Sequence, residues 1–348
     1  MNDLSEQFVE RITAASSDQP LCIRGGGSKD FYGEARRGEV IDTRGHAGIV
    51  AYEPTELVIT ARCGTPLAEI EAALAAQNQF LAFEPPTFGA GTVGGAVAAG
   101  LSGPRRASVG ALRDYVLGVT ILSGVPRRLT FGGTVMKNVA GYDVSRLMAG
   151  SLGTLGLILE VSLKVLPRPV AEASLRFDLP QAKALDALNA WAGQPLPLSA
   201  SCWCDDALTL RLSGAEAAVA AAMRRLGGDG VTDAAAFWTS LREQRHAFFA
   251  GDETLMRLSL PSNAPPLALP GAQLIEWGGS QRWWRGDAAT AREVAAKAGG
   301  HAVLFRGADK SAGVFQPLPA PILNIHRRLK AAFDPRGVFN TGRLYPNL

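Results

Sequence analysis

Residues 137–160 read Lys-Asn-Val-Ala-Gly-Tyr-Asp-Val-Ser-Arg-Leu-Met-Ala-Gly-Ser-Leu-Gly-Thr-Leu-Gly-Leu-Ile-Leu-Glu. Glycine lets the backbone adopt left-handed angles and lets a ligand approach it closely. Successive amide groups in such a turn form a concave anion site. The stretch therefore predicts a cradle for a flat cofactor that carries phosphate. The alternative is a tight turn between packed elements. The residues that would form the cradle are Gly150, Ser151, Gly153, Thr154, Gly156 and Ile158.

A second glycine cluster lies near the N-terminus. A short apolar strand ends at Arg24, and Gly25, Gly26, Gly27 and Ser28 follow. Three consecutive glycines cost backbone entropy on folding, which favours a role in close approach to a ligand. Their amide groups suit a pyrophosphate, and Arg24 is placed to neutralise it. The cluster lacks the Gly-Lys-Ser/Thr ending of a Walker loop, and a glycine-rich hairpin is the alternative.

A third cluster contains Thr92, Val93, Gly94 and Gly95 and continues with small residues to Gly100. Such a small face lets a helix or turn lie flush against a flat group, or pack closely on a sheet. Farther along the chain, Arg113 and Asp114 precede a strand-like run at 116–122. This pair either sets the electric field near the cofactor or forms a surface salt bridge.

Together these clusters resemble the FAD-binding domain of the vanillyl-alcohol oxidase type, also called the PCMH type. The matching segments are 24–28, 92–95, 113–118 and 150–156. Four further segments resemble the FAD-binding subunit of bacterial glycolate oxidase. They are 131–133, 135–143, 164–169 and 334–343, so the resemblance spans nearly the whole chain.

The resemblance implies an α+β protein with a PCMH-type FAD-binding domain of two α+β subdomains at 1–169. It also implies a smaller α+β cap domain at 170–325 and a C-terminal segment at 326–348 that packs back on the FAD domain. This return brings Asn340 and Arg343 near the flavin, where a cation stabilises the anionic reduced form. A plain proline–glycine turn is the alternative for 334–343.

The predicted cofactor is non-covalent FAD. Some relatives link FAD through a histidine that immediately follows the first glycine cluster, and Ser28 occupies that place here. A cysteine link is equally disfavoured, because no cysteine lies between Cys63 and Cys202. No catalytic residue and no metal ligand is assigned.

The resemblance implies one subunit of a glycolate, or 2-hydroxy acid, dehydrogenase that passes electrons toward an iron–sulfur subunit. A larger homologous FAD-binding subunit is the second implied partner. The histidine-rich cap element of catalytic relatives is missing, and the four histidines are scattered. A stand-alone dehydrogenase that uses His301 or His326 as base is one alternative. A non-catalytic scaffold that retains FAD is the other.

Composition excludes several other classes. The 348 residues include 35 basic and 32 acidic side chains, so nothing indicates a nucleic-acid surface. No uncharged apolar run reaches the ~18 residues of a membrane span, and the N-terminus lacks the order of a signal peptide. Four cysteines without a cluster pattern read as reduced thiols. We therefore expect a cytoplasmic protein, with peripheral attachment to the inner face of the membrane through the complex as the alternative.

Periodicity predicts the elements around these motifs. Leu4, Phe8 and Ile12 indicate an N-terminal amphipathic helix. Thr65 is the expected N-cap of a helix that begins at Pro66 and buries a stripe at 67, 70 and 74. Strands are expected at 57–61, 116–122, 157–165, 208–212 and 302–305, and alanine-rich helices at 182–191, 215–226 and 288–298. Core packing is favoured over a stacking surface for Trp277, Trp283 and Trp284.

Overall fold

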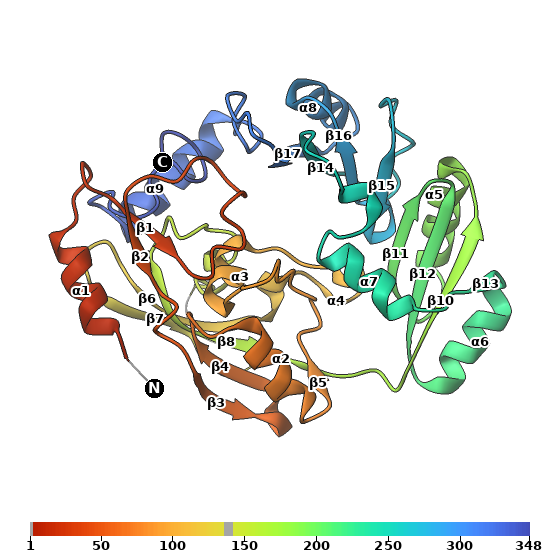
Figure 1. The fold of residues 1–348 in the computed structure, drawn as a ribbon, viewed down its shortest axis with the longest axis horizontal. Coiled ribbons are helices and arrows are strands. Elements are labelled where there is room, and N and C mark those ends of the chain that lie inside the picture. The colour runs from red at the N-terminus through yellow and green to blue at the C-terminus, as the bar shows by residue number, and fades with distance from the viewer. Residues whose placement is uncertain (1–2, 136–141) are drawn as a thin grey trace. The chain divides into compact units, whose positions relative to one another are not determined.

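The computed structural model describes residues 3–135 and 142–348 (Figure 1). The described chain forms two compact units. The first contains residues 1–101, 111–167 and 317–348, and the second contains 102–110 and 168–316. Most of the 135–143 motif that supported the glycolate oxidase resemblance lies outside the described residues.

The first unit is a mixed α+β structure. Its helices and strands are α1 (Ser5–Ala14), β1 (Leu21–Arg24), β2 (Glu39–Asp42), β3 (Ile49–Glu53), β4 (Val58–Arg62), α2 (Leu67–Ala75), β5 (Gln79–Phe80), α3 (Val93–Ala99), β6 (Val116–Leu122), β7 (Arg128–Gly132), β8 (Leu157–Lys164), β9 (Leu166–Pro167) and α9 (Ala320–Phe333). Short 3₁₀ turns stand at Pro54–Glu56, Leu112–Tyr115 and Arg146–Met148.

An antiparallel five-stranded sheet with the order β3-β4-β8-β6-β7 forms the framework of this unit. β6 and β8 are buried along most of their length, as expected for central strands with nearly continuous apolar sequence. The strands predicted at 57–61, 116–122 and 157–165 are thus confirmed as β4, β6 and β8. The glycine run at 150–156 leads directly into β8.

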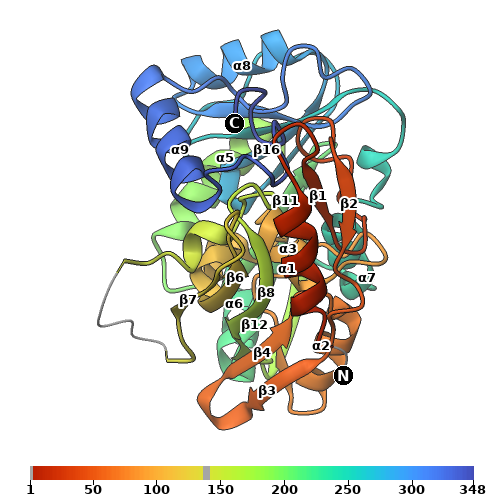
Figure 2. The same cartoon turned by 90° about the vertical axis from the view of Figure 1, so that its left-hand side faces the viewer.

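A smaller parallel pair, β1 and β2, carries the first glycine cluster at its end. The N-terminal helix α1 packs beside this pair (Figure 2). Phe8 and Ile12 of α1 are buried in one core with Leu21, Val338 and Phe339. Phe339 also forms a parallel bridge with Leu21, so the C-terminal segment is a second partner of β1 beside β2. The predicted N-terminal helix is confirmed.

The predicted start of α2 is wrong in its capping detail. The hydroxyl of Thr65 accepts from the Gly48 amide at 2.9 Å and donates to the Arg62 carbonyl at 2.7 Å, and no side chain caps α2. Tertiary contacts of the preceding loop therefore compete successfully for this hydroxyl. The buried stripe of α2 at 67, 70 and 74 is confirmed, with exposures of 1% or less.

The second unit contains an eight-stranded antiparallel sheet with the order β13-β10-β12-β11-β15-β16-β14-β17. Its elements are α4 (Arg106–Val109), β10 (Ala171–Asp178), α5 (Gln181–Ala192), β11 (Leu198–Cys204), β12 (Ala207–Gly214), α6 (Glu216–Leu226), β13 (Asp229–Gly230), α7 (Ala234–Arg242), β14 (Leu255–Ser259), β15 (Gln273–Glu276), β16 (Gln281–Arg285), α8 (Ala288–Lys297) and β17 (His301–Arg306). The three predicted alanine-rich helices are confirmed as α5, α6 and α8.

The tryptophans serve the core of this second unit. Trp283 and Trp284 are 4% and 3% exposed, and Trp283 packs edge-on against two phenylalanines. Trp277 is partly buried and donates to the Gly103 carbonyl at 3.0 Å. Across the described residues, no helix is both long and apolar enough to cross a membrane.

Candidate cofactor site

A cavity of about 90 Å³ opens in the first unit at the end of β1. Its walls are residues 22–30 with Arg36, the face of α3 that carries Gly95, Ala98 and Ala99, the residue Leu152, and the C-terminal Asn340 and Arg343. Sites for drug-sized ligands measure roughly 300–1,000 Å³. The cavity is therefore the size of one part of a dinucleotide, such as its pyrophosphate.

The three consecutive glycines are required by a close approach of two backbone segments. A Cβ on Gly26 would lie 1.5 Å from the carbonyl oxygen of Ala90, and one on Gly25 would lie 2.4 Å from the Thr92 hydroxyl. Gly27 has φ of +73°, a conformation that favours glycine. The cluster at 25–27 thus packs directly against the loop that leads into α3. This packing is what forms the cavity floor.

The floor presents hydrogen-bond donors. Within the described residues, the amides of Gly26, Gly27 and Ser28 donate no hydrogen bond. Backbone donors that lack a protein partner are met by solvent or by a ligand. A curved row of such amides is an anion-binding arrangement.

Cations surround these donors. Arg24 and Arg36 share the Asp30 carboxylate, with N···O distances of 2.9 and 2.8 Å. Lys29 also lines the cavity, where its ammonium lies 5.4 Å from the centre of the Phe88 ring. One carboxylate therefore faces three flexible cations, and the excess positive charge suits a pyrophosphate.

The helix α3 supplies the small face that the sequence predicted. Thr92 is its N-cap and accepts a hydrogen bond from the Gly95 amide at 3.3 Å. Gly95 lines the cavity, whereas Val93 and Gly94 lie outside the lining. A Cβ on Gly94 would meet Cys63 at 2.5 Å, so this glycine serves close packing.

The glycine loop at 150–156 is hydrogen-bonded to α3 and contributes Leu152 to the cavity lining. The amides of Gly150 and Leu152 donate to Val97 and Ala98 at the end of α3, at 3.0 and 2.8 Å. The remaining predicted cradle residues of this loop satisfy one another or the core. Ser151 and Thr154 are buried and bonded within the loop, and Gly153 faces Asn340. Gly156 directly precedes β8, and Ile158 is buried within that strand.

Asn340 and Arg343, which the resemblance implies lie near the flavin, both line the cavity. Asn340 accepts from the Ile23 amide at 2.7 Å and donates to the Leu152 carbonyl at 2.5 Å. Arg343 donates to the carbonyls of Asp30, Tyr32 and Glu34, and burial lowers the pKa of its guanidinium. Its charge thus holds the 30–34 loop in place beside the cavity.

Arg113 and Asp114 stand apart from this cavity. The Arg113 side chain is 68% exposed, and its Nε lies 3.9 Å from Oδ1 of Asp114. Asp114 accepts from the Ala111 amide at 2.9 Å and so caps its own turn. The structure places this pair in a surface cluster with Arg146.

Sequence reasoning missed several lining residues. Lys29, Asp30, Arg36, Ala98 and Ala99 line the cavity, and none was predicted as a site residue. Lys29 and Asp30 directly follow the first cluster, so proximity along the chain was an available signal. Arg36 lies farther along, and only the salt bridge to Asp30 brings it to the cavity.

Among the described residues, no histidine lines the cavity and no metal-binding cluster stands beside it. Over residues 3–135 and 142–348, no group of three or more His, Cys, Asp and Glu side chains is placed to hold a metal. Burial lowers the pKa of His301, which stands in β17 of the second unit, and His326 lies on α9. The four cysteines are free, and burial raises the pKa of Cys63 and Cys204 to about 12, which makes these thiols unreactive.

The residues present fit the pyrophosphate of a dinucleotide such as FAD. The observation that supports this is the row of amides without protein partners at 26–28, in a cavity whose lining includes Arg24, Lys29, Arg36 and Arg343. At each of the glycines 25–27, an added Cβ would lie within 2.4 Å of a neighbouring atom, so a side chain there would take up the space that brings this row into place. An anionic group with several acceptor oxygens satisfies both features.

Comparisons with known proteins agree with this chemistry. A family model described as an FAD binding domain matches residues 5–132. Glycolate oxidase subunit GlcE of Escherichia coli (strain K12) is 51% identical and aligns over 99% of each chain. Glycolate oxidase subunit GlcD of Bacillus subtilis (strain 168) is 29% identical over 48% of this chain and 36% of its own length.

Two further comparisons cover part of the chain or its fold. A D-lactate dehydrogenase of Anaerostipes hadrus is 38% identical over 36% of this chain and 26% of its own length. A solved structure of alkyldihydroxyacetonephosphate synthase superposes with a TM-score of 0.66 over 97% of this chain and 74% of its own, at 15% identity. The structural likeness confirms the α+β fold expected from the sequence.

Proposed function

Because this chain belongs to the family of the glycolate oxidase subunit GlcE, we propose that it is an FAD-binding subunit of a multi-subunit glycolate, or 2-hydroxy acid, dehydrogenase. The observation that carries this proposal is the 51% identity over 99% of both chains. The partial relatives are named for glycolate and D-lactate, which are both 2-hydroxy acids. The reaction class is therefore oxidation of a CH–OH group by an FAD-dependent oxidoreductase.

The part of this chain in the reaction is to bind and orient the cofactor. When bound, FAD supplies a hydride acceptor that can pass electrons on singly. The amides at 26–28 would donate to the pyrophosphate, and Arg24 and Arg36 would neutralise its charge. Gly95 leaves room for the ligand against α3. These are roles that the local geometry supports for the predicted site.

Two partners complete the proposed enzyme. A larger homologous FAD-binding subunit oxidises the substrate, and an iron–sulfur subunit takes up the electrons. The reason is that the cavity lining contains no histidine, and the described residues contain no metal-binding cluster. We place the complex in the cytoplasm, with attachment to the inner face of the membrane through a partner as the alternative.

The first test is the visible spectrum of the purified chain. We expect the absorption of oxidised flavin, with all of the yellow colour released into the supernatant after acid precipitation. Release is expected because Ser28 stands where a linking histidine would be, and no cysteine lies between Cys63 and Cys202. Colour that stays in the precipitate would mean a covalent link. A colourless chain that takes up no added FAD would refute the proposal.

Arg36 offers a test of the charge around the cavity. Replacing Arg36 with glutamine should weaken FAD binding by about 3- to 10-fold, a reduced effect because the side chain is 38% exposed and screened. The matched control is Arg37→Gln, which removes the same charge from a neighbouring exposed residue outside the lining. Titration of each apoprotein by flavin fluorescence measures the difference. Equal affinities in the two variants would mean that Arg36 makes no contact with the cofactor.

A further inference from the structure

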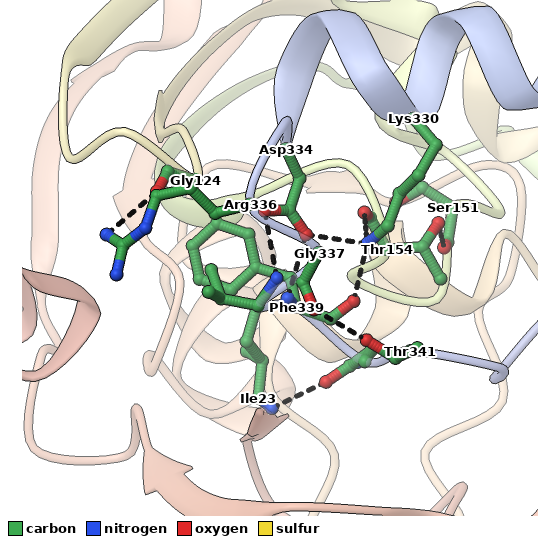
Figure 3. A network of polar contacts seen from close by, with 12 residues as sticks. Ile23, Gly124, Ser151, Thr154, Lys330, Asp334, Arg336, Gly337, Phe339 and Thr341 are labelled. Carbon is green, nitrogen blue, oxygen red and sulfur yellow. Dashed lines mark hydrogen bonds and ion pairs between the residues drawn. The ribbon is translucent and has the colours of Figure 1, made fainter. Parts of the chain in front are cut away.

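Asp334, at the end of α9, is the centre of a buried polar network (Figure 3). Its carboxylate is fully buried and accepts from the amides of Val338 and Phe339, at 3.0 and 2.8 Å. The Lys330 ammonium lies 2.7 Å from it. A buried carboxylate is tolerated only with such partners. The turn from α9 into the C-terminal segment is therefore fixed by one side chain.

Lys330 connects this turn to the glycine loop. Its ammonium donates to Asp334, to the Phe339 carbonyl at 2.7 Å and to the Thr154 carbonyl at 2.8 Å. An ammonium has three donors, and all three are used. One side chain thus holds the end of α9, the C-terminal segment and the loop at 150–156 together.

Asn340 extends the network into the cavity. Its backbone N–H donates to the Leu21 carbonyl at 2.9 Å. Its side chain accepts from the Ile23 amide and donates to the Leu152 carbonyl. Ile23, in β1, and Leu152, in the glycine loop, both line the cavity. The Asn340 side chain therefore bridges the end of β1 and the glycine loop, and its length sets the distance between them.

Backbone strain at the same place indicates that this geometry is imposed. Asn340 has φ of +41° and Leu152 has φ of +49°, both in the left-handed region. Asparagine tolerates this region, but a bulky leucine seldom adopts it. Such strain persists only where the surroundings fix it, and it is concentrated at functional sites. The bond from Asn340 to Leu152 is one of the contacts that fix it here.

We propose that Lys330, Asp334 and Asn340 form a C-terminal clamp whose role is to position the cavity walls for FAD, so that the clamp controls how long the cofactor stays bound. Lys330 and Asp334 do not line the cavity and act through Asn340 and Thr154 as positioning residues. This inference rests on the proposed function, since it assumes that the cavity holds FAD. It adds residues of α9 to the determinants of cofactor retention.

The test is the rate of FAD release from the holoprotein after dilution, followed by the fluorescence of free flavin. Asn340→Asp keeps the acceptor for the Ile23 amide but removes the donor to Leu152. We expect roughly 5- to 50-fold faster release, the effect of leaving one buried carbonyl without its donor. Lys330→Met should act in the same direction. Asn340→Ser removes both side-chain bonds and decides the question if Lys330→Met does not fold.

A matched control separates positioning from loss of stability. Leu74→Ala removes a fully buried side chain of α2 in the same unit, outside the clamp and the cavity lining. It should lower the melting temperature and leave FAD release at 20 °C unchanged. The proposal is overturned if the Asn340 variants release FAD at the wild-type rate while melting earlier. A wild-type chain that binds no FAD would instead refute the proposed function, and the clamp with it.

Discussion

Replacing Gly95 with valine should weaken FAD binding by about 5- to 150-fold while the first unit keeps its fold, because overpacking a fitted site costs about 1–3 kcal/mol. Gly95 lies in α3, and its φ is outside the left-handed region, so valine adds no backbone strain there. The nearest described atom to an added Cβ is the Thr92 hydroxyl oxygen, at 3.2 Å. The rest of the new side chain enters the cavity.

The measurement is an FAD titration of the apoprotein, with circular dichroism as the check on folding. Gly230→Val is the matched control, because Gly230 is exposed in β13 of the second unit and no atom lies within 4 Å of its Cβ position. It should bind FAD as the unsubstituted chain does. Unchanged affinity in Gly95→Val would show that the cofactor does not lie against α3.

Gly26 and Gly153 look like equally good targets in the sequence, but the structure makes them poor ones. Valine at Gly26 would collide with the Ala90 carbonyl, and valine at Gly153 would combine a left-handed φ with a contact of 2.7 Å to Asn340. Both substitutions therefore disturb packing of the protein itself. Loss of FAD in either variant would not distinguish a blocked ligand site from a damaged fold.

The single chain should oxidise glycolate about 10²–10⁴-fold more slowly per flavin than the assembled complex, since a positioned general base contributes a factor of that size. The cavity lining contains no histidine, and His301 and His326 both lie outside it. Among the described residues, no group of three or more His, Cys, Asp and Glu side chains is placed to hold a metal.

The experiment compares dye reduction by the purified single chain with that by the co-expressed complex, each normalised to flavin content. Omitting this chain from the co-expression should abolish activity of the remaining subunits. Comparable turnover per flavin in the single chain and the complex would contradict the subunit assignment and favour a stand-alone dehydrogenase. Full activity without bound FAD in this chain would favour the scaffold alternative.

Local sequence was a good guide wherever the conformation is set locally. The glycines at 25–27, the small face of α3 and the apolar runs of β6 and β8 are all readable, because backbone freedom and burial depend on residue type. The FAD-binding class and the family followed from the same motifs. The failure at Thr65 has the opposite cause, since a hydroxyl that suits an N-cap found partners in the preceding loop instead.

The sequence did not predict the direction in which the side chains of these motifs face. Ser151 and Thr154 were expected to form part of the cofactor cradle, but both are buried and their hydroxyls bond within their own loop. Arg343 was expected near the flavin as a cation, and its guanidinium donates to three carbonyls of the 30–34 loop. A motif predicts that donors are present, and only the fold decides which of them face the ligand.

Long-range contacts account for what the tertiary structure alone decided. Lys330 meets Thr154 across 176 residues, and Asn340 meets Ile23 across 317. Residues 102–110 belong to the second unit although the chain on both sides belongs to the first. Residue type and periodicity describe a neighbourhood of a few residues, so they determined the elements, the glycine turns and the cofactor class. The place of Arg343 at the cavity and the C-terminal clamp arise only when distant segments pack together, because their partners are chosen by the folded core.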